Sequence, residues 1–146
     1  MLELFDGPLP VEDILTRWYK EEARSNYGAY IPFIGTVREE SGIEALSFDI
    51  YEPILQSWFD AWQAKARSAG AVLKMAHSRG DVPVHTSSYI AAVFSPKRRV
   101  ALEMIEAFVE DFKASAPIWK YDIKAGKRLY AEDRSTPMPG SGLLKG

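Results

Sequence analysis

Hydrophobic residues recur at helical spacing in three stretches of the chain, residues 11–23, 53–70 and 96–113. Apolar side chains three and four positions apart form one continuous helix face, which can pack on a core. In the second stretch, proline stands at the expected first helical position and glycine at the end. In the third, Ser95 is expected to cap the helix and Pro96 to occupy its first position. The pattern therefore predicts three amphipathic helices.

The segments between these helices are rich in β-branched and aromatic residues, which predicts strands. The expected strands cover residues 2–5, 27–37, 45–52, 71–77, 87–95, 118–124 and 127–132. Proline cannot donate a ladder hydrogen bond, so Pro32 predicts that the second strand lies at a sheet edge or contains a bulge. Gly35 marks a second irregularity in that strand. A turn-rich segment at 78–86 is expected to join two strands, and Ala125-Gly126 predicts a hairpin.

The expected order of elements is β-α-β-β-α-β-β-α-β-β, in which helices do not alternate strictly with strands. This order predicts an α+β fold with a mostly antiparallel sheet rather than a doubly wound parallel sheet. The chain has 146 residues and shows no internal repeat or linker. We therefore expect one domain over residues 1–132. Residues 133–146 are rich in proline, glycine and serine, which predicts a mobile C-terminal tail.

Composition narrows the classes of function. Hydrophobic residues make up 47% of the chain and charged residues 26%, as in globular proteins. The net charge of −2 argues against a nucleic-acid-binding protein, so any basic site must be a local cluster. The chain has no cysteine, which excludes thiol nucleophiles and disulfides, and two histidines are too few for a His-rich metal site. We find no secretory signal and no apolar run long enough to span a membrane, so the cytoplasm is the expected compartment.

Basic residues stand at both ends of the third predicted helix. Lys97, Arg98 and Arg99 fall in its first turn, where each cation opposes the helix dipole by about 0.3–1 kcal/mol. This turn is either a solvated basic surface or, with the unpaired N–H groups, an anion site. A straight helix would hold Lys97 and Lys113 about 24 Å apart. They are therefore either unrelated, or a second copy of the chain brings its basic turn to Lys113.

Two further cations stand in or at the end of predicted strands. Lys120 follows Trp119, and a lysine near aromatic surface loses solvation, which lowers its pKa and favours a role as nucleophile or proton shuttle. The alternative is a lysine whose stem packs on Trp119. Arg38 ends the sequence GTVR and could bind carboxylate or phosphate in bidentate fashion, or simply be solvated. His77 and His85 lack a triad pattern, and we interpret both as structural.

Four segments resemble the catalytic (large) subunit family of molybdopterin synthase. They are FIGTVR (33–38), FDIYEP (48–53), the H-x-x-G motif from His77 to Gly80, and SPKRRVALEMIEAFVEDFKASAPIWK (95–120). The last is the most specific, because the family carries a helix ending in lysine and then Ala-Pro, an apolar residue and Trp-Lys at this spacing. The resemblance extends from about residue 27 to about residue 130.

The resemblance implies an α/β-hammerhead fold and a sulfurtransferase. The family converts precursor Z, a cyclic pyranopterin monophosphate, into molybdopterin by adding two sulfurs as a dithiolene. The sulfur arrives as a thiocarboxylate on the C-terminal Gly-Gly of a small ubiquitin-like subunit. A homodimer of the large subunit carries one small subunit at each end, which makes a heterotetramer. The resemblance implies no metal and no redox cofactor, since a partner supplies the sulfur.

The resemblance also assigns site residues. Lys113 and Lys120 match the two active-site lysines of the family. The substrate-binding set adds Thr36, Val37, Arg38, Lys97, Arg98, Tyr121 and Asp122. The family usually has histidine at the position of Lys97, and a lysine there keeps the positive charge but does not titrate near neutral pH.

A non-catalytic module is the alternative function. It would use the same basic pocket to bind the acidic C-terminal peptide of a partner protein, without sulfur transfer.

Overall fold

The computed structural model describes residues 1–130, and its elements follow the predicted order. They are β1 (Leu2–Asp6), α1 (Val11–Glu22), β2 (Ala29–Thr36), β3 (Ala45–Ile50), α2 (Glu52–Ser68), β4 (Val72–Pro83), β5 (Ser87–Ser95), α3 (Arg98–Ser115), β6 (Ile118–Lys124) and β7 (Lys127–Tyr130). The α+β expectation is confirmed. The tail predicted at 133–146 lies outside the described residues.

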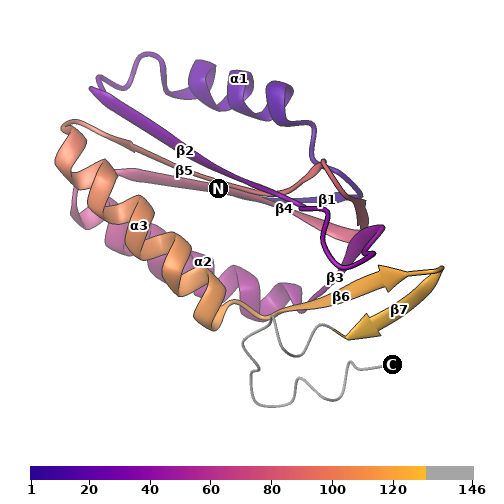
Figure 1. The fold of residues 1–146 in the computed structure, drawn as a ribbon. Coiled ribbons are helices and arrows are strands. Elements are labelled where there is room, and N and C mark those ends of the chain that lie inside the picture. The colour runs from indigo at the N-terminus through magenta and orange to yellow at the C-terminus, as the bar shows by residue number, and fades with distance from the viewer. Residues whose placement is uncertain (131–146) are drawn as a thin grey trace.

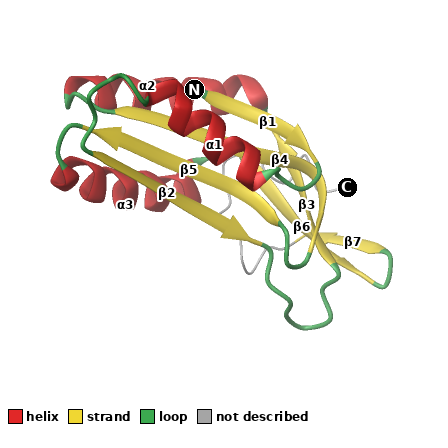
Figure 2. Cartoon of the chain, turned by 90° about the horizontal axis from the view of Figure 1, so that it is seen from above, coloured by secondary structure: helices red, strands yellow, loops and turns green. Residues whose placement is uncertain are grey.

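One mixed sheet forms the centre of the fold, with the strand order β2-β5-β4-β3-β6-β7 (Figure 2). These neighbours are antiparallel, and β1 pairs with β4 in parallel. β2 lies at the sheet edge, as Pro32 predicts, and its register with β5 shifts between Gly35 and Thr36. The edge position expected from Pro32 and the irregularity expected at Gly35 are therefore confirmed.

Helices cover both faces of the sheet, with α1 on one side and α2 and α3 on the other (Figure 1). Every residue of β5 is buried, because the strand has a helix layer on each face. Val93 packs in the cluster that includes α2 and α3, whereas its neighbours Ala92 and Phe94 pack with Ile14 and Trp18 of α1. Each large side chain buried in this way contributes about 1.5–3 kcal/mol to stability. None of the described helices is long and apolar enough to cross a membrane.

The predicted end of β4 at residue 77 is wrong, because the strand continues to Pro83. Its first part pairs with β5 as far as His77, and its last part, from Gly80 to Pro83, pairs with β3. Gly80 has φ +75°, a conformation that glycine adopts without strain. The turn-type residues of this segment therefore bend one strand from one partner to the next, instead of ending it.

The predicted cap of α3 is also wrong. The helix begins at Arg98, with Lys97 at the N-cap and no side-chain cap hydrogen bond. The buried Ser95 hydroxyl instead donates to the backbone carbonyl of Lys97. The basic first turn of α3 is thus present as expected. Ser95, however, hydrogen-bonds within the segment that precedes the helix and does not cap the first N–H groups of α3.

β6 and β7 form the predicted hairpin at one end of the sheet. Ala125 and Gly126 both have positive φ, 49° and 75°, as two-residue hairpin turns require. The guanidinium of Arg128 lies 3.6 Å from the ring centre of Tyr121 and pairs with Asp49 at 2.7 Å. These contacts tie β7 to β6 and β3, so β6 is held on both sides.

Candidate active site

A pocket of about 360 Å³ lies where β2, β3, β4, β5, β6 and α3 approach one another. Its walls are mostly apolar and aromatic, and charged groups share them. The lining residues are Phe33, Gly35, Thr36, Val37, Arg38, Glu40, Leu46, Phe48, His77, Ser88, Tyr89, Val109, Glu110, Phe112, Lys113, Ala116, Ile118 and Lys120. The pocket therefore combines three cations and two carboxylates with an apolar wall, and its excess of positive charge suits an anionic ligand that also has an apolar or flat part.

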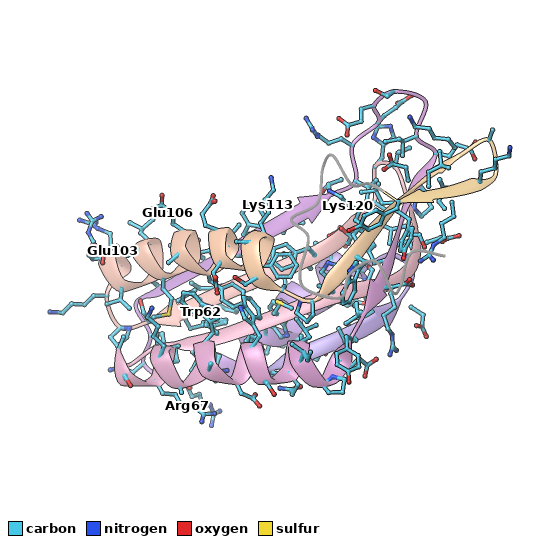
Figure 3. The ribbon with its side chains drawn as sticks, turned by 90° about the horizontal axis from the view of Figure 1, so that it is seen from below. Trp62, Arg67, Glu103, Glu106, Lys113 and Lys120 are labelled. Atoms are coloured by element: carbon cyan, nitrogen blue, oxygen red, sulfur yellow. The ribbon has the colours of Figure 1, made fainter. Side chains whose placement is uncertain are left out.

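Lys113 and Lys120 both line this pocket, although they belong to different elements. Lys113 lies near the C-terminal end of α3, and Lys120 lies on β6 (Figure 3). The buried Pro117 stands between the helix and the strand, and its carbonyl accepts a hydrogen bond from the Tyr51 N–H at 3.2 Å. This anchored connection explains how the two lysines come to one site.

The alternation of β6 determines which of its side chains face the pocket. Ile118 and Lys120 line it, whereas the buried Trp119 and Tyr121 belong to the opposite face of the strand. The alternation directs the Lys120 side chain away from Trp119, so the interpretation of a lysine stem packed on Trp119 is wrong. Lys120 is directly opposite Phe48 of β3, which also lines the pocket.

The backbone around Val37 positions Arg38 at the pocket. The Val37 N–H donates to the Thr86 carbonyl at 2.9 Å, and the His85 N–H donates to the Val37 carbonyl at 2.7 Å. The chain is thus held on both sides just before Arg38. The Arg38 side chain is 82% exposed and lies 3.3 Å from Glu40. A guanidinium this accessible can bind a ligand phosphate or carboxylate at the mouth of the pocket.

The remaining predicted site residues do not line the pocket of this single chain. Lys97 and Arg98 are exposed at the opposite end of α3 from Lys113. Tyr121 packs with Arg128 instead, and Asp122, on the same face of β6 as Lys120, lies two pairs further along the strand, opposite Leu46. The structure therefore brings together Thr36, Val37, Arg38, Lys113 and Lys120, and it leaves the other four outside.

The aromatic residues of the pocket wall that surround His77 were not predicted from the sequence. Tyr89 stacks on Phe112 with ring centres 4.1 Å apart, and His77 lies 5.0 Å from Phe48 and 5.6 Å from Phe112. Burial lowers the pKa of His77 to about 4 and raises the pKa of Tyr89 above its usual range. The H-x-x-G motif was the only sequence signal for this histidine, and no spacing pattern connects it to Phe112.

The described residues contain no cluster of three or more His, Cys, Asp or Glu side chains that could hold a metal ion. The pocket itself offers amino and guanidinium groups, with the carboxylates of Glu40 and Glu110, beside an apolar surface. The amino and guanidinium groups bind anions and stabilise negative charge that develops during a reaction.

Comparisons with known proteins show the family of this chain. A sequence profile described as "MoaE protein" matches residues 6–115. The molybdopterin synthase catalytic subunit of Helicobacter pylori strain 26695 is 49% identical over 144 residues, with 99% of both chains covered. The Dictyostelium discoideum protein of the same name is 30% identical over 117 residues, covering 73% of this chain and 72% of that protein.

Solved structures show the same fold. One is described as a complex of subunits 1 and 2 of molybdopterin-converting factor from Helicobacter pylori 26695, and its matching chain has a TM-score of 0.92 at 48% identity, with 98% of both chains covered. A molybdopterin synthase structure from Staphylococcus aureus matches with a TM-score of 0.76 at 24% identity, over 88% of this chain and 94% of that one, and supports the fold alone. With a family profile over most of its length and a relative 49% identical from end to end, this chain belongs to the MoaE family of molybdopterin synthase catalytic subunits.

Proposed function

We propose that the pocket is a sulfur-transfer site, at which precursor Z receives the two sulfurs of the molybdopterin dithiolene. The observation that carries this proposal is that Lys113 and Lys120 line one pocket together with Arg38. The chain has no cysteine, so its own side chains offer no thiol to carry the sulfur. A thiocarboxylate at the C-terminal Gly-Gly of a small ubiquitin-like subunit is the proposed donor.

The two lysines are proposed as the catalytic residues. A terminal thiocarboxylate is an anion, and two ammonium groups in one pocket can hold it in place. The thiocarboxylate sulfur first bonds to the substrate, and water then attacks the carbonyl carbon of the resulting thioester. The C–S bond to that carbon breaks, so the sulfur stays on the substrate and the small subunit leaves as a carboxylate. Negative charge develops on the carbonyl oxygen during the attack by water. Preorganised cations stabilise that charge more strongly beside an apolar wall than in bulk water, since the local dielectric constant is lower. One of the lysines is also a candidate for moving protons between substrate and solvent.

The pterin phosphate is proposed to bind Arg38 of one chain and the basic turn of another. Lys97 and Arg98 lie at the far end of α3, about 24 Å from Lys113 for a straight helix. One small substrate cannot contact both ends of α3 in a single chain. A second copy can bring its Lys97 and Arg98 to the first copy's Lys113, so the complete site needs a homodimer. Tyr121 and Asp122, which follow Lys120 on β6, are proposed as further substrate-binding residues of this site.

The proposed assembly is a heterotetramer of two catalytic chains with one small subunit at each outer end. Support comes from the Helicobacter pylori structure, which is described as a complex of subunits 1 and 2. We expect no metal or redox cofactor of the chain's own, since the substrate is a pterin phosphate and the partner supplies the sulfur. The cytoplasm is the proposed compartment, in keeping with the absence of cysteine.

Reconstitution tests this function. The purified chain is mixed with thiocarboxylated small subunit and precursor Z, and molybdopterin is measured. We expect molybdopterin to form only when all three components are present. Binding of the small subunit without any sulfur incorporation would favour the alternative, a non-catalytic module for an acidic C-terminal peptide.

A further inference from the structure

His77 lies in the wall of the pocket at the point where β4 changes partners. It is the last residue of β4 that pairs with β5, where it is opposite Tyr89. Its side chain is only 2% exposed, and Phe48, Phe112 and Tyr89 surround the ring with centres 5.0, 5.6 and 5.8 Å away. Three different elements thus fix the imidazole in place, yet the ring still lines the pocket.

One hydrogen bond determines the tautomer of this histidine. The Nδ1 atom lies 2.8 Å from the backbone carbonyl oxygen of Ser78. A carbonyl oxygen can only accept, so Nδ1 carries the hydrogen and donates it. Burial lowers the pKa of His77 to about 4, so the ring is neutral near neutral pH. Nε2 therefore carries a lone pair and can only accept a hydrogen bond.

The surroundings of the ring favour this neutral state. The charged groups that line the same pocket are Arg38, Glu40, Glu110, Lys113 and Lys120. Within residues 1–130, Arg38 pairs with Glu40, and the hydrogen bond of the His77 ring runs from Nδ1 to Ser78, which leaves Nε2 available to a ligand. The hydroxyl of Tyr89, beside His77, is buried without a hydrogen-bond partner among the described residues. Buried polar atoms are normally satisfied, so this hydroxyl indicates that a ligand supplies the missing bond in the pocket wall where His77 also lies.

We propose that Nε2 of His77 accepts a hydrogen bond from an amide-type N–H of the molecule bound next to Lys113 and Lys120. This inference rests on the proposed function and adds a specificity residue to it. Both molecules expected in the pocket carry such a group: the peptide N–H beside the terminal thiocarboxylate, and the lactam N–H of the pterin. The lysines hold the anionic part, and His77 selects for a donor beside it. A ligand without that donor would leave Nε2 desolvated and unpaired, which weakens binding.

The test is a pair of titrations of the ¹⁵N-histidine-labelled dimer, one with the small subunit in its carboxylate form and one with precursor Z. Accepting a hydrogen bond moves the Nε2 resonance upfield without the signature of a protonated ring. We expect this shift in at least one titration, and the titration that produces it identifies the donor. Both ligands binding without moving the Nε2 resonance would overturn the proposal.

Two variants give an independent measurement. His77→Leu keeps an apolar side chain but removes the acceptor, and we expect it to bind the donor ligand about 3- to 10-fold more weakly. His77→Gln places an amide oxygen near the position of Nε2 and should recover most of that affinity. Equal affinity of wild type and His77→Leu for both ligands would also overturn the proposal. Because these are binding measurements, inactive enzyme with an intact Nε2 shift would count against the sulfur-transfer proposal and leave His77 as an acceptor.

Discussion

Lys113 and Lys120 reach the same pocket from a helix and a strand that are joined only by the short segment around the buried Pro117. The pairing of Lys120 with Phe48 and the hydrogen bond from Tyr51 to Pro117 fix the two sides of this connection. Each lysine therefore depends on a different layer of the fold. Lys113 depends on how α3 packs, and Lys120 depends on the register of β6.

The packing of α3 near Lys113 depends on one carboxylate. Asp111 accepts hydrogen bonds from the indole N–H groups of Trp58 at 2.9 Å and Trp62 at 2.7 Å, both on α2. Asp111→Asn removes the charge and one acceptor oxygen, and we expect a loss of about 1–3 kcal/mol in the free energy of unfolding, measured by urea denaturation. Asp60→Asn, the same change at an exposed site on α2, should stay within about 0.5 kcal/mol of the wild type. Equal losses in both variants would argue against a special role for Asp111.

The same carboxylate should make stability depend on acid pH. Burial acts to raise the pKa of Asp111, but hydrogen bonds from Trp62, Ser115 and Trp58 outweigh it and leave the pKa below its ordinary value. A lowered pKa in the folded state means that the stabilisation is complete above the ordinary pKa of about 3.9 and is lost as the pH falls through the folded value. The difference in stability between wild type and Asp111→Asn should therefore shrink below about pH 4.

His77 should affect stability in a different pH range. Burial lowers its pKa from 6.5 to about 4, so the unfolded chain binds a proton that the folded chain does not. The effect of His77 on the free energy of unfolding is then small above pH 6.5, and stability falls as the pH decreases from 6.5 toward 4. Between pH 8 and pH 5 this group alone should cost the wild type about 2 kcal/mol. His77→Gln, which cannot titrate, should show a flatter profile in urea denaturation, and parallel profiles would contradict the buried neutral state.

Mixed dimers can test whether two chains share a site. Lys113→Ala and Arg98→Ala chains are each expected to be inactive as homodimers. If Arg98 serves the partner's pocket, co-refolding the two variants restores one intact site in each mixed dimer, or about a quarter of wild-type molybdopterin formation for statistical mixing.

The control for that experiment uses two residues of one pocket. Lys113→Ala and Lys120→Ala chains, when mixed, leave every site with one missing lysine, so no activity should return. Absence of recovery in the Arg98 mixture as well, despite verified chain exchange, would show that Arg98 does not act across a dimer.

Local sequence patterns predicted the order of the elements because they depend on neighbours in the chain. The helical face of α3 and the edge position of Pro32 are both visible in a short window of sequence. The end of β4 could not be predicted from such a window, because a glycine such as Gly80 occurs both in turns and in bent strands. Only the change of pairing from β5 to β3 separates the two cases, and that is a long-range property.

The residues of the site were likewise predictable from the sequence only where the signal is local. The lysine-to-lysine spacing in KASAPIWK is local, so Lys113 and Lys120 could be proposed from the sequence and its resemblance to a family. His77 could not, because its surroundings come from β3, β5 and α3, which are distant in the chain. The missing partner at the Tyr89 hydroxyl, beside His77, becomes visible only when those elements are packed together.

The most direct test of the central claim is molybdopterin formation by Lys113→Ala and Lys120→Ala in the reconstituted reaction with thiocarboxylated small subunit and precursor Z. Each replacement is expected to abolish dithiolene formation, while thermal melting and the dimer stay close to those of the wild type. Lys124→Ala, a lysine on the same strand that does not line the pocket, should remain active. Wild-type turnover in either Lys113→Ala or Lys120→Ala would contradict the assignment of this pocket as the sulfur-transfer site.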